Sequence, residues 1–263
     1  MLIIGEKING TIGRVNEAVQ ARDEAFIIDL ARSQLENGAD IVDVNVGAGG
    51  DENDNLVWAT QIIQKSLDVP LMLDSGNPEA LLAAIKVHQG RPILNSISGE
   101  EWKMEKLLPA LINNRCGVVA LCMDDNGMPS GPEATFKVAE RILERLFKAG
   151  VKQEDIYLDP LVLSIATEFQ AAKIATDSIR LILKKYPKVH TIMAISNIGF
   201  GLPSRRLLNR AFLAAAMTAG LDSFLVDVKD RSLMAMVWAA NLLSGNDEGC
   251  RDYLKAYRGG VLG

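Results

Sequence analysis

The chain has 263 residues, 48% hydrophobic but only 5% aromatic, with a formal net charge of −5 at pH 7. An acidic balance without a basic run argues against nucleic acid as a partner. The N-terminus lacks the features of a signal peptide and no stretch of about 18 apolar residues occurs, so we expect a cytoplasmic protein without a membrane partner.

Short apolar runs alternate with longer segments of helical periodicity, a pattern typical of βα units and a parallel sheet. In chain order, the predicted strands are residues 2–5, 41–46, 71–74, 92–96, 118–123, 156–159, 191–196 and 223–227. Eight strands in 263 residues leave about 33 residues for each unit, the size of a βα repeat. We therefore predict one α/β domain over residues 1–263, a closed (β/α)₈ TIM barrel.

The predicted helices fill the intervals between the strands. In one of them, Val138, Ile142 and Leu146 form an apolar stripe between charged residues, and Gly150 supplies a C-terminal stop. Similar patterns predict helices over residues 24–37, 78–88, 205–219 and 231–244, and one more short helix within 247–263. These helices are expected to form the outer ring of the barrel.

Polar side chains lie at or next to the end of nearly every predicted strand. They are Glu6 and Asn9, Asp43 and Asn45, Asp74, Asn95, Asp124, Asp159, Ser196 and Asn197, and Asp227. Such strand ends meet at one mouth of a barrel. Carboxylates accept hydrogen bonds, while carboxamides both donate and accept, so the set complements a flat heterocycle such as a reduced pterin. Each residue alone also suits a turn or a helix N-cap, but their recurrence favours a binding site.

The residues that commonly bind transition metals are few. Cys116, Cys122 and Cys250 form no CxxC pair, and an odd number of cysteines is ordinary in a reducing compartment. His88 and His190 are predicted at the end of the barrel away from the polar strand ends. We expect no metal bound by this chain, and a core position for Cys122.

The polar motifs resemble, in order and in spacing, those of the methyltetrahydrofolate:corrinoid protein methyltransferases, members of the pterin-binding barrel superfamily. The matching segments are IIGEKING at 3–10, DVNVG at 43–47, LDS at 73–75, NS at 95–96, DPL at 159–161 and ISN at 195–197. The resemblance covers essentially the whole chain. It implies a homodimeric enzyme that transfers a methyl group between N5 of tetrahydrofolate, or its 5-methyl form, and the cobalt of cobalamin on a separate corrinoid protein.

The resemblance also implies roles for individual residues. The implied pterin-binding set is Asp74, Asn95, Asp159, Asn197, Asp43, Asn45, Glu6, Asn9 and Ser196. Within it, the catalytic residues would be Asn197, Asp159 and Asp74. Asn197 would reach N5, which must gain a proton or a strong hydrogen bond as its bond to the methyl carbon breaks. Arg205 would contact the folate tail or the corrinoid partner.

Two other functions remain open at this point. A dihydropteroate synthase-like enzyme would form a C–N bond, but the Asn-x-Thr-Pro-Asp-Ser-Phe and Ser-Thr-Arg-Pro loops of that family are replaced here by EKING at 6–10 and NVGAGG at 45–50. A non-catalytic pterin-binding or corrinoid-docking protein would bind folate without transferring a methyl group. The direction of transfer and the identity of the corrinoid protein are also open.

Overall fold

The strands of the computed structural model, which describes residues 1–262, close into a single parallel barrel. They are β1 (Leu2–Asn9), β2 (Ile41–Asn45), β3 (Leu71–Asp74), β4 (Ile93–Ser98), β5 (Gly117–Leu121), β6 (Ile156–Asp159), β7 (His190–Ala194) and β8 (Ser223–Val226). Each strand pairs with the next in sequence, and β8 closes the ring on β1. The predicted fold is confirmed; Gly263, the last residue of the predicted domain, lies outside the described residues.

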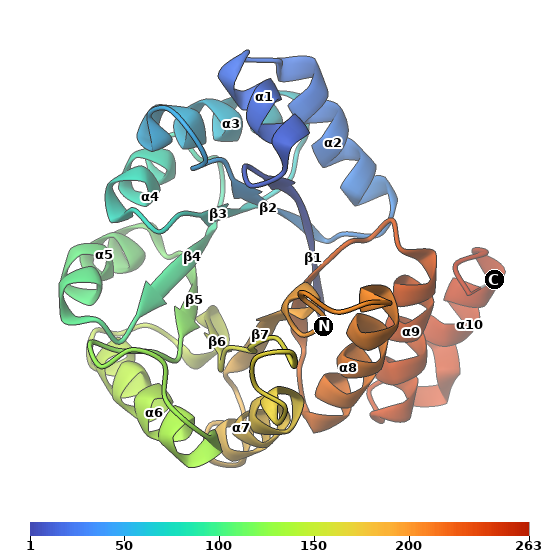
Figure 1. Cartoon of the computed structure of the whole chain (residues 1–263). Coiled ribbons are helices and arrows are strands. Elements are labelled where there is room, and N and C mark those ends of the chain that lie inside the picture. Colours follow the sequence, from blue (N-terminus) through green and yellow to red (C-terminus); the bar gives the residue numbers. More distant parts are fainter. Residues whose placement is uncertain (263) are drawn as a thin grey trace.

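The helices form an outer ring around the strands (Figure 1). They are α1 (Gly13–Gln20), α2 (Glu24–Glu36), α3 (Glu52–Ser66), α4 (Pro78–Ile85), α5 (Glu101–Asn114), α6 (Pro132–Lys148), α7 (Ala171–Lys185), α8 (Arg205–Ala219), α9 (Arg231–Leu243) and α10 (Arg251–Arg258). Local signals fix several of their ends. Asn77 accepts a hydrogen bond from the Glu79 amide at 3.0 Å and Pro78 occupies the first turn of α4. Within residues 1–262, no helix has the length and apolar character needed to cross a bilayer.

Alternate residues of each strand serve two different cores, as the period of two in a strand requires. Ile4, Ile41, Met72, Val119 and Ile192 fill the barrel interior. Their sequence neighbours, such as Ile3, Val42, Leu73, Val118 and Met193, pack outward under the helices. These aliphatic side chains fill the half of the interior nearer the start of the strands. The polar side chains that point inward therefore lie at the other end, where the strands finish.

Only β3 and β6 have the predicted bounds; the other six strands differ at one or both ends, and the differences in β1 and β7 concern polar residues of the predicted site. The first predicted strand ended at Gly5, but β1 runs to Asn9 with an irregularity in its pairing to β2 between Gly5 and Ile8. Glu6 and Lys7 fit in this strand because their side chains contact Ser196, after β7, and Asp227, after β8. In contrast, β7 ends at Ala194, and the next three residues form a 3-10 turn, η2 (Ile195–Asn197).

Candidate active site

Three adjacent strands place polar side chains at the same level of the barrel mouth. Asn45 of β2 lies beside Asp74 of β3, which lies beside Asn95 of β4. The Nδ2 of Asn45 donates a hydrogen bond to Oδ2 of Asp74 at 2.8 Å. The Nδ2 of Asn95 donates a hydrogen bond at 3.2 Å to Oδ1 of Asp43, which lies two residues before Asn45 on β2. The structure therefore joins these four predicted residues into one cluster.

The two carboxyl groups of this cluster interact strongly. Burial raises the pKa of Asp43 well above its ordinary value, and the charge of Asp74 raises it further. Burial also raises the pKa of Asp74, to about 6, although the hydrogen bond from Asn45 acts in the opposite direction. Burial and the charge of Asp74 thus favour the protonated form of Asp43, whereas Asp74, with a pKa of about 6, is mostly ionised at neutral pH. The cluster presents one carboxylate and two carboxamides.

Asp159 ends β6 and belongs to a different part of the mouth. Its Oδ1 accepts a hydrogen bond from the backbone N–H of Leu161 at 2.8 Å. Burial raises the pKa of Asp159 to about 7, and the hydrogen bond only partly offsets this effect. Its carboxyl group is therefore able to gain or lose a proton near neutral pH.

The remaining predicted residues line a hollow of about 550 Å³ between β1, β7 and β8. The Oγ of Ser196 donates a hydrogen bond to Oε2 of Glu6 at 3.2 Å, and burial raises the pKa of Glu6. Asn197, in η2, is exposed to this hollow. Asn9 lines it as well, but its Oδ1 accepts hydrogen bonds from the amide and hydroxyl of Thr11 at 2.9 and 2.7 Å. The side chain of Asn9 thus also shapes the turn after β1.

Sequence reasoning missed two charged groups that contact this site. Glu52, in the first turn of α3, accepts a hydrogen bond from the hydroxyl of Ser75, and its charge also raises the pKa of Asp74. Lys7 of β1 forms an ion pair at 2.8 Å with Asp227, the residue that follows β8. The only local signal for Glu52 was an acidic residue at a helix start, which is too common to mark a site. Lys7 lies in the matching segment at 3–10 but was given no role, because its partner is distant in sequence.

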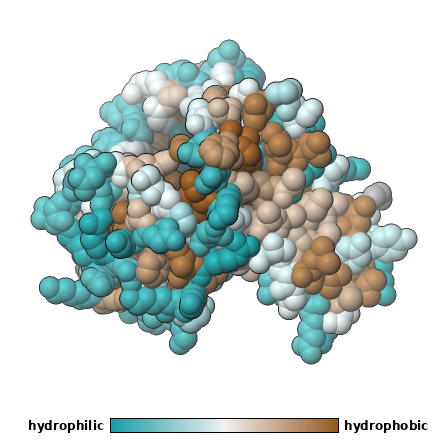
Figure 2. Space-filling view, turned by 60° about the horizontal axis from the view of Figure 1, so that its bottom comes forward, coloured by the Kyte–Doolittle hydropathy of each residue, from teal (hydrophilic) through white to brown (hydrophobic). Residues whose placement is uncertain are grey.

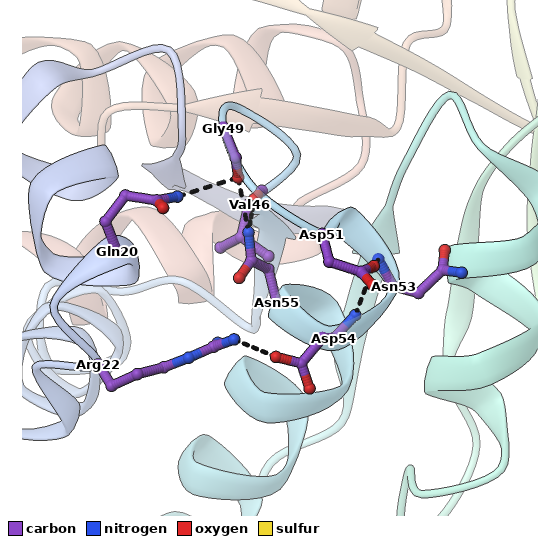
Figure 3. Close-up of polar contacts among 8 residues, drawn as sticks. All are labelled: Gln20, Arg22, Val46, Gly49, Asp51, Asn53, Asp54 and Asn55. Atoms are coloured by element: carbon purple, nitrogen blue, oxygen red, sulfur yellow. Dashed lines mark hydrogen bonds and ion pairs between the residues drawn. The ribbon is translucent and has the colours of Figure 1, made fainter.

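The loop between β2 and α3 is held by side-chain amides from two helices (Figure 3). The Nε2 of Gln20 and the Nδ2 of Asn55 both donate to the backbone oxygen of Gly49 at 2.9 Å. Asp51 caps α3 by accepting from the amide of Asn53 at 2.9 Å. This loop follows Asn45 and leads into Glu52, so its attachment fixes one wall of the mouth.

The predicted non-site residues lie elsewhere. The Nε2 of His88 contacts the backbone N–H of Leu71 at 3.2 Å, where β3 begins. His190 begins β7, and its Nδ1 lies 2.6 Å from Oδ2 of Asp222. Both histidines are thus at the opposite end of the strands from the mouth, as predicted, and Cys122 is fully buried. Among residues 1–262, no group of three or more His, Cys, Asp or Glu side chains is arranged to hold a metal ion.

Comparison with known proteins places these observations in a family context. Residues 5–227 match the model of the family described as pterin binding enzyme. The chain is 38% identical over 269 residues to the methylcorrinoid:tetrahydrofolate methyltransferase of Eubacterium limosum, covering 100% of this chain and 98% of that protein. It is also 31% identical over 240 residues to the methionine synthase of Mycobacterium tuberculosis, covering 86% of this chain but only 20% of that longer protein.

Solved structures of similar shape include dihydropteroate synthases. The Xanthomonas albilineans enzyme with 4-aminobenzoic acid has a TM-score of 0.66 and 19% sequence identity, covering 93% of this chain and 92% of that chain. The Yersinia pestis enzyme with a pterine–sulfa conjugate has a TM-score of 0.63 and 17% identity, covering 92% of both chains. At such identities the likeness concerns the fold alone.

Proposed function

Because this chain belongs to the pterin-binding enzymes, and within them to the family of the methylcorrinoid:tetrahydrofolate methyltransferases, we propose that it moves a methyl group between N5 of tetrahydrofolate and the cobalt of a corrinoid on a separate protein. The observation that carries this proposal is the hydrogen-bonded cluster of Asp43, Asn45, Asp74 and Asn95. It stands at the same mouth as Asp159 and Asn197.

The cluster suits the edge of a pterin ring. Asp74, as a carboxylate, accepts hydrogen bonds from ring N–H and amino groups, while the amide of Asn95 serves a ring carbonyl or nitrogen. Asp159 offers a second acceptor from β6. Asp43 and Asn45 form the floor and hold Asn95 and Asp74 in place. Glu6, Asn9 and Ser196 complete the wall on the side of β1 and β7.

The chemical step moves a proton as well as a methyl group. When tetrahydrofolate accepts the methyl group, N5 forms a bond to the methyl carbon, the carbon–cobalt bond leaves its electron pair on cobalt, and N5 loses its proton. In the opposite direction N5 must regain that proton. Asn197 would hydrogen-bond N5 in both directions, and Asp74 and Asp159, with pKa values of about 6 and about 7, are able to exchange the proton near neutral pH.

We take methylcorrinoid as the donor and tetrahydrofolate as the acceptor, following the name of the Eubacterium limosum relative. The acceptor site must then be open to a protein, because the corrinoid travels on one. Large exposed apolar side chains occur in the segments that follow several strands of the barrel. They are Ile12, Trp102, Met128, Phe169 and Phe200. A polar pocket within such a rim favours a protein partner over a small molecule alone.

The dihydropteroate synthase alternative has weaker support. The likeness to those enzymes is one of shape, at 17–19% identity. The loop after β2 reads Gly47-Ala48-Gly49-Gly50 and is fastened through the backbone oxygen of Gly49. It contains none of the Ser-Thr-Arg-Pro residues expected of a synthase.

Three broader statements belong to the same proposal. We propose that residues 1–263 act as one domain, that the protein is cytoplasmic, and that it forms a homodimer. The three cysteines are free, as expected in a reducing compartment. The outer face of α8 supports the homodimer, because Leu207, Ala211 and Ala215 are exposed along it. Figure 2, in which the lower edge of Figure 1 comes forward, shows hydrophobic residues gathered in patches among hydrophilic ones on the face turned to the reader.

An anaerobic absorbance assay tests the activity directly. Methylcobalamin with tetrahydrofolate, and Co(I) cobalamin with 5-methyltetrahydrofolate, should each react in the presence of the enzyme, with gain or loss of the Co(I) band. A calorimetric titration runs in parallel. Absence of folate binding would contradict the proposal. Folate binding without methyl transfer, even with a corrinoid protein as partner, would favour a non-catalytic binding protein. Formation of dihydropteroate from a pterin pyrophosphate and 4-aminobenzoate would favour a synthase.

A further inference from the structure

Arg205, the first residue of α8, turns its guanidinium group back toward the end of β7. Its Nε and Nη2 both donate to a single acceptor, the backbone oxygen of Ser196, at 3.1 and 2.6 Å. This carbonyl group and the N–H of Asn197 belong to the same planar peptide unit. A forked pair of hydrogen bonds to the oxygen therefore restricts the orientation of the peptide that leads into Asn197.

Other contacts hold the same turn from different sides. The hydroxyl of Ser196 bonds to Glu6 of β1 at 3.2 Å, and the backbone N–H of Phe200 donates to the oxygen of Asn197 at 3.1 Å. The ring centre of Phe200 lies 5.5 Å from the guanidinium carbon of Arg205. These contacts leave Arg205 between an aromatic ring and the peptide that it holds, a position in which its planar group loses freedom.

The path of the Arg205 side chain depends on Gly199. A Cβ atom on Gly199 would lie 2.7 Å from Cγ of Arg205 and 2.7 Å from Oδ1 of Asn209, and 3.0 Å from the backbone oxygen of Arg205. Side chains do not approach so closely, and the backbone oxygen has little room to move. A residue larger than glycine at 199 would therefore displace Arg205 from Ser196 without removing its charge.

We propose that Arg205 is a positioning residue that holds the Ser196–Asn197 peptide, and through it the amide group of Asn197, in the orientation needed at N5. This inference rests on the proposed methyl transfer. It differs from the expectation that Arg205 contacts the folate tail, because two of its donors already bind within the chain. Misplacement of a group by about 1 Å costs about 100-fold in rate, so a device that fixes this peptide has a measurable effect.

The test compares Arg205→Gln and Gly199→Ala with the wild type and with Arg180→Gln, which removes an exposed arginine that pairs with Asp177 on α7. Single-turnover transfer with Co(I) cobalamin is measured with 5-methyltetrahydrofolate and with a 5-methyltetrahydropterin that lacks the tail. We expect both test variants to react about 10- to 100-fold more slowly with either substrate. Dissociation constants should stay within about twofold of the wild type.

A second readout does not depend on activity. Amide hydrogen exchange in residues 195–200 should be faster in Arg205→Gln and in Gly199→Ala than in Arg180→Gln. Unchanged exchange together with wild-type rates would overturn the proposal. A variant that loses only affinity for 5-methyltetrahydrofolate, and not for the substrate without the tail, would also overturn it. Such a result would show that Arg205 binds the folate tail. If the wild type itself transfers no methyl group, the proposed function fails, and exchange at residues 195–200 still decides whether Arg205 holds this peptide.

Discussion

Asn197 and Asp74 face the same mouth, but their surroundings assign them different tasks. Asn197 is exposed at the end of η2 and lines the hollow between β1, β7 and β8. Asp74 is held by Asn45 at 2.8 Å and lies between Asn45 and Asn95 in the sheet. The exposed amide of Asn197 is available for a hydrogen bond to a bound substrate. The carboxylate of Asp74 is already held in position before the substrate binds.

Replacement of Asn197 should therefore lower mainly the rate of methyl transfer, and replacement of Asp74 mainly the affinity for folate. Asn197→Ala should slow single-turnover methyl transfer by about 100-fold, because it removes a hydrogen bond that matters most as charge changes on N5, and should barely alter folate affinity. Asp74→Ala should weaken folate binding by about 10- to 100-fold, the value of a hydrogen bond to a charged group. Stopped-flow absorbance and calorimetry measure the two quantities. Equal losses of rate and affinity in Asn197→Ala would contradict the role at N5.

Asp159 should make the stability of the folded protein depend on pH. Its pKa is about 7 in the folded state, against an ordinary value of 3.8. Between these pH values the folded state binds more protons at this position than the unfolded state, so this residue makes the protein more stable as pH falls from about 7 toward about 4. Above about pH 7, the buried charge lowers stability.

Asp159→Asn isolates this contribution. The variant should be more stable than the wild type at about pH 8, and this advantage should shrink as pH falls to about 5. Thermal unfolding without folate measures the melting temperature of both proteins across this range. The difference between the two proteins removes the contribution of every other titrating group. A constant difference in melting temperature across the range would mean that Asp159 does not titrate there.

At the level of elements, the sequence predicts strands best where a buried run ends on a residue that faces the mouth. β3 and β6 have the predicted bounds, residues 71–74 and 156–159, because Asp74 and Asp159 both end the strand and face inward. β1 was predicted too short because Glu6 and Lys7 are polar. Their partners, Ser196 and Asp227, come from the other end of the chain, which no local pattern reveals.

The helices α1, α3, α5 and α7 were not singled out in the sequence, and α3 shows why. Its inner face includes Asn55, with 4% of its surface exposed, and Thr60, with none, so the apolar stripe is interrupted by polar residues. Thr60 donates to the backbone oxygen of Leu56 at 2.7 Å, and Asn55 to that of Gly49. The residue types of the site were predictable from strand periodicity, but links between loops, such as Glu52 with Ser75, depend on loop paths that the sequence pattern does not encode.

The attachment of the loop between β2 and α3 gives a prediction for paired residues. Gly49 receives two amide donors, so Gln20→Ala or Asn55→Ala alone leaves one of them, whereas the double variant leaves none. Each lost hydrogen bond should cost about 1 kcal/mol, and the double variant should lose about 0.5–1 kcal/mol more than the sum of the two single changes. The double variant should also bind folate more weakly, because Asn45 precedes this loop.

Urea unfolding measures the free energies, and amide exchange of residues 46–51 reports the loop itself. Asn114→Ala is the matched control, since the Asn114 side-chain amide donates to the backbone oxygen of Ala110 within α5, away from this loop. Strict additivity with unchanged exchange in the loop would show that the two amides do not act together.

At the scale of the whole molecule, polar and apolar groups are separated along the barrel axis and across the surface. The interior core lies below the mouth, and exposed apolar residues such as Phe169, at 78% exposure, and Phe200, at 66%, belong to loops around the polar site. α8 adds a second exposed apolar region on the outer ring, with Leu207 at 65% exposure. Two separate regions are compatible with two partners, a corrinoid protein at the mouth and a second copy of the chain at the side.

The homodimer proposal gives a prediction for α8. Leu207, Ala211 and Ala215 recur at intervals of four residues, so they share one exposed face of the helix. Such a face, with small residues that permit close approach, suits a dimer interface, where a stable contact covers about 800 Å² on each partner.

Ala215→Glu places a charge in this face and should convert the dimer to a monomer, as measured by sedimentation velocity, with an unchanged circular dichroism spectrum. Gln61→Glu, on the exposed side of α3, adds the same charge away from α8 and should remain dimeric. A wild type that sediments as a monomer would contradict the dimer itself, and a dimeric Ala215→Glu would place the interface elsewhere.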